Sequence, residues 1–200
     1  MDVQATMVKL VNFPMMHEQH SRSYRVWAGA RLTNSDLKLR FKIEAAAPKE
    51  FEQIIFPVSQ ALAKRAQNLW EETCFECFIP SPKSDAYLEF NGSPSGLWNL
   101  FSFKKYRSDR IEFPLQFDSE PKMSFVTKND RQLECEWLIP LTAIQQGLIS
   151  QGENHHQFYN IGISTVLNTR VATTYWALKH EGIKPDFHLR SSFVYPIKSP

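Results

Sequence analysis

The chain has 200 residues and a formal net charge of +2, and it contains 15 Phe, 6 Tyr and 5 Trp. Its charges are mixed along the sequence without a basic block, which argues against nucleic acid as a partner. No apolar run approaches the ~18 residues that cross a bilayer, and the N-terminus lacks a basic segment followed by a long apolar one. We therefore expect a single domain over residues 1–200 with no membrane partner. We expect a cytoplasmic location, or a periplasmic or secreted one if a signal segment has been removed.

Two segments in the first quarter of the chain predict neighbouring strands. Residues 24–32 and residues 35–44 (SDLKLRFKIE) carry apolar side chains at every second position. A period of two is typical of strands with one buried face. The pair Thr33–Asn34 between the two segments predicts a short hairpin connection.

The next segments predict one helix and two further strands. Residues 59–70 fit a helix with Ser59 as its N-cap, although the same residues also fit a loop. Residues 72–79 and residues 87–91 alternate between apolar and polar side chains, which predicts two strands. Each of these strands has one apolar face and one face that carries carboxylates.

The second half of the chain continues the strand pattern. Residues 133–139 alternate cleanly, and residues 158–168 and 173–178 predict a hairpin that turns at 168–171. A last short strand is expected over residues 192–195.

Residues 140–147 (PLTAIQQG) predict one or two helical turns, with Gly147 as the C-cap. In all, about ten strands with turn signals every 8–12 residues predict an all-β fold. We expect a two-sheet antiparallel β-sandwich, jelly-roll or immunoglobulin-like, with one or two short helices. A closed barrel is the alternative. No alternation of strands and helices supports a parallel sheet.

The three cysteines do not predict a metal or redox site. Cys74 and Cys77 form a C-x-x-C pair, but residues three apart on a strand point to opposite faces. A zinc site also needs a second pair of ligands, and none follows at a suitable spacing. Cys135 lies on the apolar side of its strand and is expected in the core.

Two acidic residues and an amide are the first candidates for a binding site. Glu76, Glu89 and Asn91 fall on the polar faces of two neighbouring predicted strands, so they can share one patch. The alternative is an ordinary solvated face of a sandwich. Large aromatic residues among the acids favour a site, because solvated faces rarely carry them.

The tryptophans allow two interpretations. Trp137 shares the apolar face of its strand and is expected in the core. Trp70 and Trp176 either fill the core with a satisfied N–H or form a platform for a planar or sugar ring.

The histidines and carboxylates are further candidates for catalytic or metal-binding groups. His180 and His188 lie in a Pro-containing loop, and their spacing matches no recognised ligand pattern, so surface histidines are expected. Glu76 and Glu89 fit a glycosidase-type carboxylate pair only if ~5–9.5 Å separates them. No nucleophile or phosphate-loop motif is present. We expect a non-catalytic protein.

Three segments, WEETCFECFI, YLEFNGSPSGLWN and YWALKH…PDFH, resemble the bacterial DOMON-like proteins related to carbohydrate-binding module family 9. The resemblance implies a β-sandwich that binds a small carbohydrate or glycoconjugate on one face. It implies that Trp70 and Trp176 sandwich a sugar ring. The polar partners it implies are Glu76, Glu89, Asn91 and Arg107.

The resemblance also bears on cofactors. Haem-binding relatives use an axial Met and His, and no Met falls near the candidate face; the acid-rich turn of calcium-binding relatives is absent too. We therefore expect no cofactor, with haem or calcium as the exceptions to test. Three other functions remain open: a haem- or metal-binding redox domain using His180 or His188, a glycoside hydrolase using Glu76 and Glu89, and a structural or partner-binding module.

Overall fold

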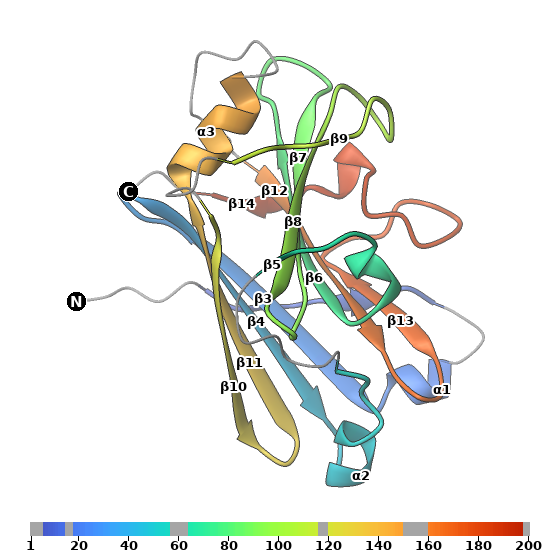
Figure 1. Ribbon diagram of the computed structural model, residues 1–200. Helices are drawn as coiled ribbons and strands as arrows, with labels where there is room; N and C mark the ends of the chain where they lie inside the picture. Colours follow the sequence, from blue (N-terminus) through green and yellow to red (C-terminus); the bar gives the residue numbers. More distant parts are fainter. Residues whose placement is uncertain (1–5, 15–17, 57–63, 116–119, 150–159, 198–200) are drawn as a thin grey trace.

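The computed structural model describes residues 6–14, 18–56, 64–115, 120–149 and 160–197 (Figure 1). Over these ranges the chain forms 14 strands in two sheets and the short helices α1 (Glu18–Ser21), α2 (Pro48–Phe51) and α3 (Leu141–Ile149). The predicted all-β sandwich of antiparallel sheets is confirmed; the short pairing of β5 with β8 is parallel. None of the helices in the described ranges is long and apolar enough to cross a membrane.

The first sheet has the strand order β1-β3-β4-β11-β10. Its strands are β1 (Val8–Lys9), β3 (Tyr24–Leu32), β4 (Asp36–Ala45), β11 (Gln132–Pro140) and β10 (Lys122–Asn129). β3 and β4 form the predicted hairpin, in which Leu32 lies opposite Leu37. Alternate residues of β4 and β11 are buried, so one face of this sheet packs in the core and the other carries charged side chains.

The second sheet has the order β2-β13-β12-β6-β7-β8-β5, with β14 on β12 and β9 on β8. Its strands are β2 (Val11–Asn12), β13 (Thr173–Ala177), β12 (Asn160–Asn168), β6 (Cys74–Pro80), β7 (Tyr87–Gly92), β8 (Leu97–Phe103), β5 (Lys64–Arg65), β14 (Tyr195–Pro196) and β9 (Ile111–Glu112). Every residue of β6 and β7 is buried, on both faces. The face turned away from the first sheet is therefore covered too.

Three local predictions differ from the structure. Of the helix expected over residues 59–70, residues 59–63 lie outside the described ranges, while Lys64–Arg65 forms β5 and Leu69–Glu71 forms the 3-10 turn η1. Over residues 64–70 the loop alternative is thus the better description. The strand expected over residues 192–195 is instead the 3-10 turn η3 (Arg190–Ser192) followed by β14.

Gly147 is not the helix C-cap, because α3 continues to Ile149. Its role is a close approach to β7. A Cβ at this position would lie 2.7 Å from Leu88 Cδ1, closer than real Cβ atoms come to a neighbour. Glycine therefore lets α3, which lies at the end of the molecule opposite to α1 and α2, pack directly on the second sheet (Figure 1).

The main core lies between the two sheets. Trp137 from β11 is fully buried there and contacts Phe90 from β7 edge to face, as the position of Trp137 on its strand predicts. Cys77 and Cys135 belong to this core, whereas Cys74 lies in a separate cluster with Leu69 and Val166. All three cysteines are free, and the C-x-x-C sulfurs lie on opposite faces as expected.

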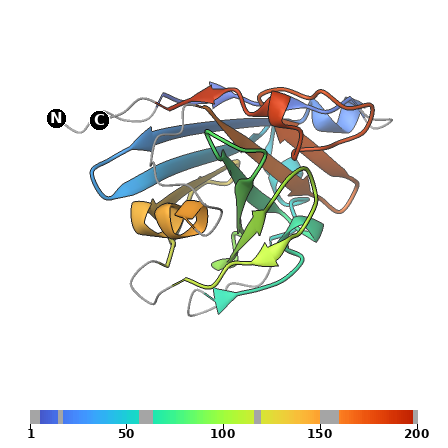
Figure 2. The same ribbon diagram turned by 90° about the horizontal axis from the view of Figure 1, so that it is seen from above.

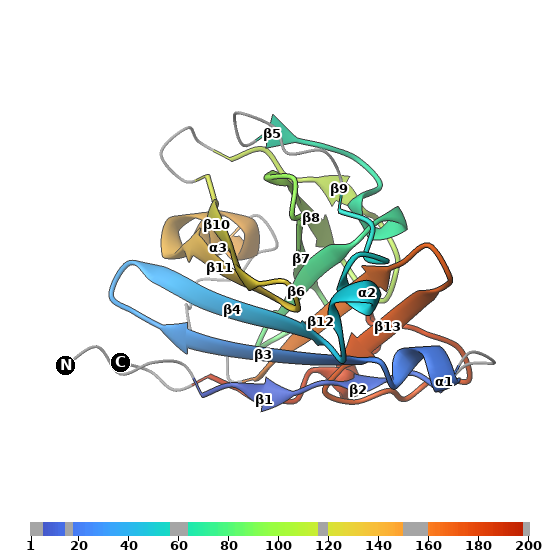
Figure 3. The ribbon, with the colours of Figure 1, turned by 90° about the horizontal axis from the view of Figure 1, so that it is seen from below.

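A second layer covers the outer face of the second sheet, the face turned away from the first. Five buried aromatic residues gather there: Phe78, Tyr87, Phe101, Phe103 and Phe193. Phe193 belongs to the C-terminal segment, residues 178–197, which follows β13. This segment lies on the side of β2 and β13 in both end views (Figures 2 and 3). A Cβ on Gly162 of β12 would lie 2.6 Å from the Phe193 ring, so this segment packs tightly on the sheet. The candidate site lies in this second layer.

Candidate functional site

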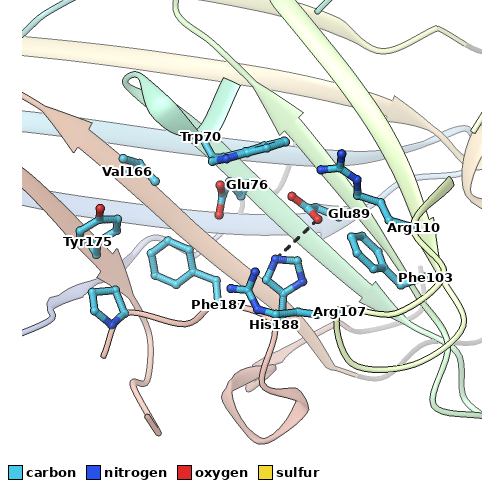
Figure 4. A pocket seen from close by; sticks show the side chains of 11 residues that line it. Trp70, Glu76, Glu89, Phe103, Arg107, Arg110, Val166, Tyr175, Phe187 and His188 are labelled. Carbon is cyan, nitrogen blue, oxygen red and sulfur yellow. Dashed lines mark ion pairs between the residues drawn. The ribbon is translucent and has the colours of Figure 1, made fainter. Parts of the chain in front are cut away.

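A cavity of about 440 Å³ lies on the outer face of the second sheet (Figure 4). The central strands supply its floor, while η1, β13, the loop after β8 and the C-terminal segment supply its walls. The residues that line it are Trp70, Glu76, Glu89, Phe103, Arg107, Arg110, Val166, Tyr175, Pro185, Phe187 and His188.

Glu76 from β6 and Glu89 from β7 form the floor. Glu76 lies opposite Asn91 in the β6–β7 ladder, and Glu89 lies two residues before Asn91, so all three side chains point to the same face. Glu76 is 3% exposed and Glu89 is 4% exposed. Figure 4 shows both carboxyl groups directed into the cavity.

Each carboxyl group has one oxygen in a hydrogen bond. Ser164, the neighbour of Glu76 across the β12–β6 ladder, donates its hydroxyl to Glu76 Oε2 at 2.9 Å. Asn91 Nδ2 donates to Glu89 Oε1 at 2.7 Å. The other oxygen of each group accepts no hydrogen bond from the part of the chain that the structure describes. Each floor residue thus keeps one acceptor for a ligand.

Burial raises the pKa of both carboxyl groups well above the ordinary range. For Glu76 the negative charge of Glu89 raises the pKa further, and the hydrogen bond from Ser164 opposes the shift. For Glu89 the hydrogen bond from Asn91 and the charges of Arg107 and Arg110 oppose the shift. The floor therefore holds two acids that lack a directly paired cation.

Aromatic side chains form two walls of the cavity. Trp70 lies in η1 after Asn68, whose left-handed φ of 58° is a conformation that Asn tolerates. On the other side, Tyr175 of β13 lies opposite Val166 in the ladder and 6.2 Å from Phe187, centroid to centroid. In Figure 4 Trp70 lies on one side of the two carboxyl groups and Phe187 with Tyr175 on the other.

Arg110 occupies one end of the Trp70 wall. Its guanidinium carbon lies 5.3 Å from the Trp70 ring centroid and 4.9 Å from that of Phe101. These distances allow cation–π attraction to both rings. Arg110 and Phe101 together hold the indole at the rim of the cavity.

Asp186 joins the two loops that border the cavity. It accepts hydrogen bonds from the Tyr106 hydroxyl, from Arg107 at 3.0 Å and from the backbone N–H of His188 at 3.0 Å. Burial alone would raise the pKa of Asp186, but these three donors lower it overall. Arg107 has a left-handed φ of 48°, and its backbone N–H donates to the Tyr87 hydroxyl at 3.2 Å. The Arg107 side chain is thereby fixed at the rim.

His188 is a neutral residue under the C-terminal segment. Burial, followed by the nearby charge of Arg107, lowers its pKa to about 3. Its Nδ1 lies 2.7 Å from the Tyr87 hydroxyl, whose oxygen already accepts from the backbone N–H of Arg107, so we assign the hydroxyl as the donor to Nδ1. The ring proton then sits on Nε2, 3.8 Å from Glu89 Oε2, too far for a hydrogen bond. A neutral ring forms no ion pair with Glu89.

The structure brings four of the six expected site residues to one cavity: Trp70, Glu76, Glu89 and Arg107. Asn91 is fully buried and contributes by holding Glu89 rather than by lining the cavity. That these residues contact a ligand stays a prediction.

Trp176 does not reach the cavity, which corrects the expected two-tryptophan arrangement. Trp176 is 3% exposed, packs in the core between the sheets, and donates from Nε1 to Thr174 Oγ1 at 2.9 Å. Because successive strand residues point to opposite faces, its neighbour Tyr175 faces the cavity instead. The aromatic partner across from Trp70 is therefore Tyr175 with Phe187.

Several lining residues were not singled out from the sequence. Tyr175 could have been found from the sequence, because it occupies the face of its strand opposite to that of Trp176. Arg110 and Phe187 lie in irregular loops, where no periodicity marks them. His188 is buried among aromatic rings rather than on the surface as expected, and His180 lies 2.8 Å from the Val11 carbonyl oxygen. No group of three or more His, Cys, Asp or Glu side chains in the described ranges is arranged to hold a metal ion.

The fold of this chain is found in solved structures. A candidate carbohydrate-binding protein from Bacteroides uniformis matches 97% of this chain and 87% of its own at a TM-score of 0.67 and 14% identity. A family 9 carbohydrate-binding module from Caldicellulosiruptor kristjanssonii, solved with cellotriose, matches 97% and 82% at a TM-score of 0.49 and 7% identity. No family model and no curated protein matches the sequence. At these identities the likeness to the first structure establishes a shared β-sandwich fold.

Proposed function

We propose that this protein binds a small carbohydrate in the cavity on the outer face of the second sheet. The observation that carries the proposal is that aromatic rings line two sides of the same cavity as two acids with free acceptor oxygens. The faces of sugar rings carry C–H groups that pack on aromatic rings, while their hydroxyls need fixed acceptors and donors. The cavity supplies both kinds of contact in one place.

The ring of the sugar lies between Trp70 on one side and Tyr175 with Phe187 on the other. Hydroxyl groups at its edge donate to the free oxygens of Glu76 and Glu89. A cavity of about 440 Å³ falls at the small end of the ~300–1,000 Å³ typical of small-molecule sites. A small saccharide is therefore the expected ligand rather than a long chain held along an open groove.

The rest of the site orients these groups and has no chemical step to perform. Asp186 fixes Arg107, and Tyr87 fixes the neutral His188 beside Glu89. The Bacteroides uniformis protein, which shares the fold, is described as a candidate for the same class of ligand. That description supports the proposal for this chain.

Tryptophan fluorescence during titration with mono- and oligosaccharides tests the proposal. We expect a saturable change in the wild type and its loss in Trp70→Ala. The matched control is Trp27→Ala, because Trp27 lies on the first sheet beside Lys42, away from the cavity. A folded wild-type protein that responds to no sugar in the panel, by fluorescence or calorimetry, contradicts the proposal.

A further inference from the structure

The charges around the cavity leave its floor without a counter-charge. The guanidinium of Arg107 lies 3.0 Å from Asp186, so that pair is neutral as a unit. Arg110 lies over the rings of Trp70 and Phe101. With both floor acids ionised, the two arginines and three carboxylates that surround the cavity sum to a net charge of −1.

Glu76 is the less compensated of the two floor acids. Arg107 and Arg110 both stabilise the ionised form of Glu89, whereas Arg107 is the one arginine that does so for Glu76. Glu76 also faces the negative charge of Glu89. Buried carboxylates of this kind are stable as ions only when a cation pairs with them.

None of the side chains in the described ranges supplies that cation. His188 is the basic group nearest to Glu89 Oε2, and it is neutral with its Nδ1 held by the Tyr87 hydroxyl. The carboxyl groups of Glu76 and Glu89, each with one free oxygen, point into the cavity (Figure 4). In the empty cavity the raised pKa values favour protonation of the two acids, and a cation on the ligand would stabilise their ionised form in place of those protons.

The walls of the cavity also suit a cation. Aromatic faces attract ammonium groups that lie within ~6 Å of the ring centroid. Trp70, Tyr175 and Phe187 line the same cavity as the two acids. An ammonium group next to Glu76 thus meets carboxylate oxygens below and aromatic rings at the sides.

We propose that the ligand is an amino sugar, whose ammonium group pairs with Glu76 and Glu89 while its ring packs on the aromatic walls. This inference rests on the proposed carbohydrate-binding function and adds the charge of the ligand to it. The ammonium donates hydrogen bonds to the two free carboxylate oxygens, and the remaining hydroxyls lie toward Arg107 and the rim. No covalent step is involved.

Calorimetry at pH 7 with four matched ligands tests this inference: glucosamine, glucose, N-acetylglucosamine and cyclohexylamine. Amines of the α-amino kind have a pKa of ~7.7–8.0, so glucosamine carries its charge at this pH. We expect glucosamine to bind at least tenfold more tightly than glucose or N-acetylglucosamine, because charged hydrogen bonds are about twice as strong as neutral ones. Cyclohexylamine, which has the ring and the ammonium without hydroxyls, should bind at least tenfold more weakly than glucosamine.

The isosteric variants Glu76→Gln and Glu89→Gln remove the charges and keep the side-chain shape. Each should reduce the preference for glucosamine over glucose to less than threefold. Glu136→Gln is the control, because Glu136 pairs with Lys38 on the exposed face of the first sheet. The ligand comparison in the wild type needs no variant, so misfolding of a variant does not affect it.

The outcomes separate the two proposals. Glucose binding as tightly as glucosamine overturns the amino-sugar inference and leaves carbohydrate binding intact. Cyclohexylamine binding as tightly as glucosamine also overturns it, because the hydroxyls are then not recognised. Binding of none of the sugars overturns the proposed function and this inference together.

Discussion

The carboxylate of Asp186 lies 3.0 Å from the guanidinium of Arg107, and this contact joins two loops that are 79 residues apart in the sequence. One loop follows β8 and the other belongs to the C-terminal segment. Both loops carry lining residues of the cavity, His188 among them. The walls of the candidate site therefore depend on one carboxylate at their junction.

Asp186→Ala is expected to weaken ligand binding at least tenfold, because it frees Arg107, Tyr106 and the backbone of His188 at once. The loss of stability should be modest, about 1–3 kcal/mol, since the partners become accessible to water. Hydrogen exchange should speed up in residues 104–110 and 179–190. The control is Glu44→Ala, which removes an exposed pair with Arg25. Unchanged exchange in both loops would show that Asp186 does not hold them.

The neighbouring residues Tyr175 and Trp176 should separate binding from stability. Tyr175→Ala removes part of the cavity wall and should weaken sugar binding while changing the free energy of unfolding little. Trp176→Ala leaves a hole in the core and should cost about 3–5 kcal/mol of stability with sugar affinity retained by the folded fraction. Denaturant unfolding and calorimetry measure the two quantities. If Trp176→Ala instead weakened sugar binding, and Tyr175→Ala instead reduced stability with affinity retained, Trp176 and not Tyr175 would contact the ligand.

The free energy of unfolding should fall as the pH rises from about 6.5 to about 8. The folded state raises the pKa of Glu76 and Glu89 above the ordinary value of 4.5, so it keeps protons that the unfolded chain has lost. The stability that this proton binding contributes is present at low pH and is lost as the pH rises through the raised pKa values. We expect a loss of about 1–2 kcal/mol over this range, or a few degrees in melting temperature.

The double variant Glu76→Gln/Glu89→Gln should abolish this slope. Below about pH 6.5 the neutral His188 acts in the opposite direction, because its lowered pKa makes the unfolded chain bind the extra proton. The comparison is therefore made above that pH. If the free energy of unfolding fell equally steeply with pH in the double variant, the pH dependence would come from groups other than Glu76 and Glu89.

His188 should remain neutral across the range in which ordinary histidines titrate. Its ring nitrogen signals in NMR spectra should keep the positions of a neutral imidazole between about pH 5 and about pH 8, because burial lowers its pKa to about 3, and only small shifts should accompany the titration of nearby Glu89. The proton should be found on Nε2, since Tyr87 donates to Nδ1. Tyr87→Phe leaves Nδ1 without a partner and should cost about 1–3 kcal/mol of stability. A titration midpoint near 6.5 would contradict the buried, neutral state.

Periodicity accounts for what the sequence predicted well. Residues 24–32 coincide with β3, and the alternation of residues 72–79 and 87–91 placed Glu76 and Glu89 on one face as observed. The solvated alternative for this face was wrong, because segments distant in sequence cover it. Alternation specifies the face of a side chain but not what lies against that face.

The remaining site residues depend on long-range contacts. Arg110 and Phe187 lie in loops whose path is set by packing and by the hydrogen bonds of Asp186, and no local pattern marks them. The choice of Trp176 over Tyr175 followed the family resemblance, although successive residues of the strand point to opposite faces. Parity is the stronger physical argument there, since it decides which of the two can face the cavity.

The most direct test of carbohydrate binding at this cavity is a titration of the wild-type protein with glucosamine and glucose, followed through the indole N–H signals of its tryptophans by NMR. We expect a saturable shift of the indole signal of Trp70, a residue that lines the cavity, while the signals of the buried Trp137 and Trp176 stay in place. A shift of Trp176 without Trp70, or no shift of Trp70 with either sugar, would contradict that expectation.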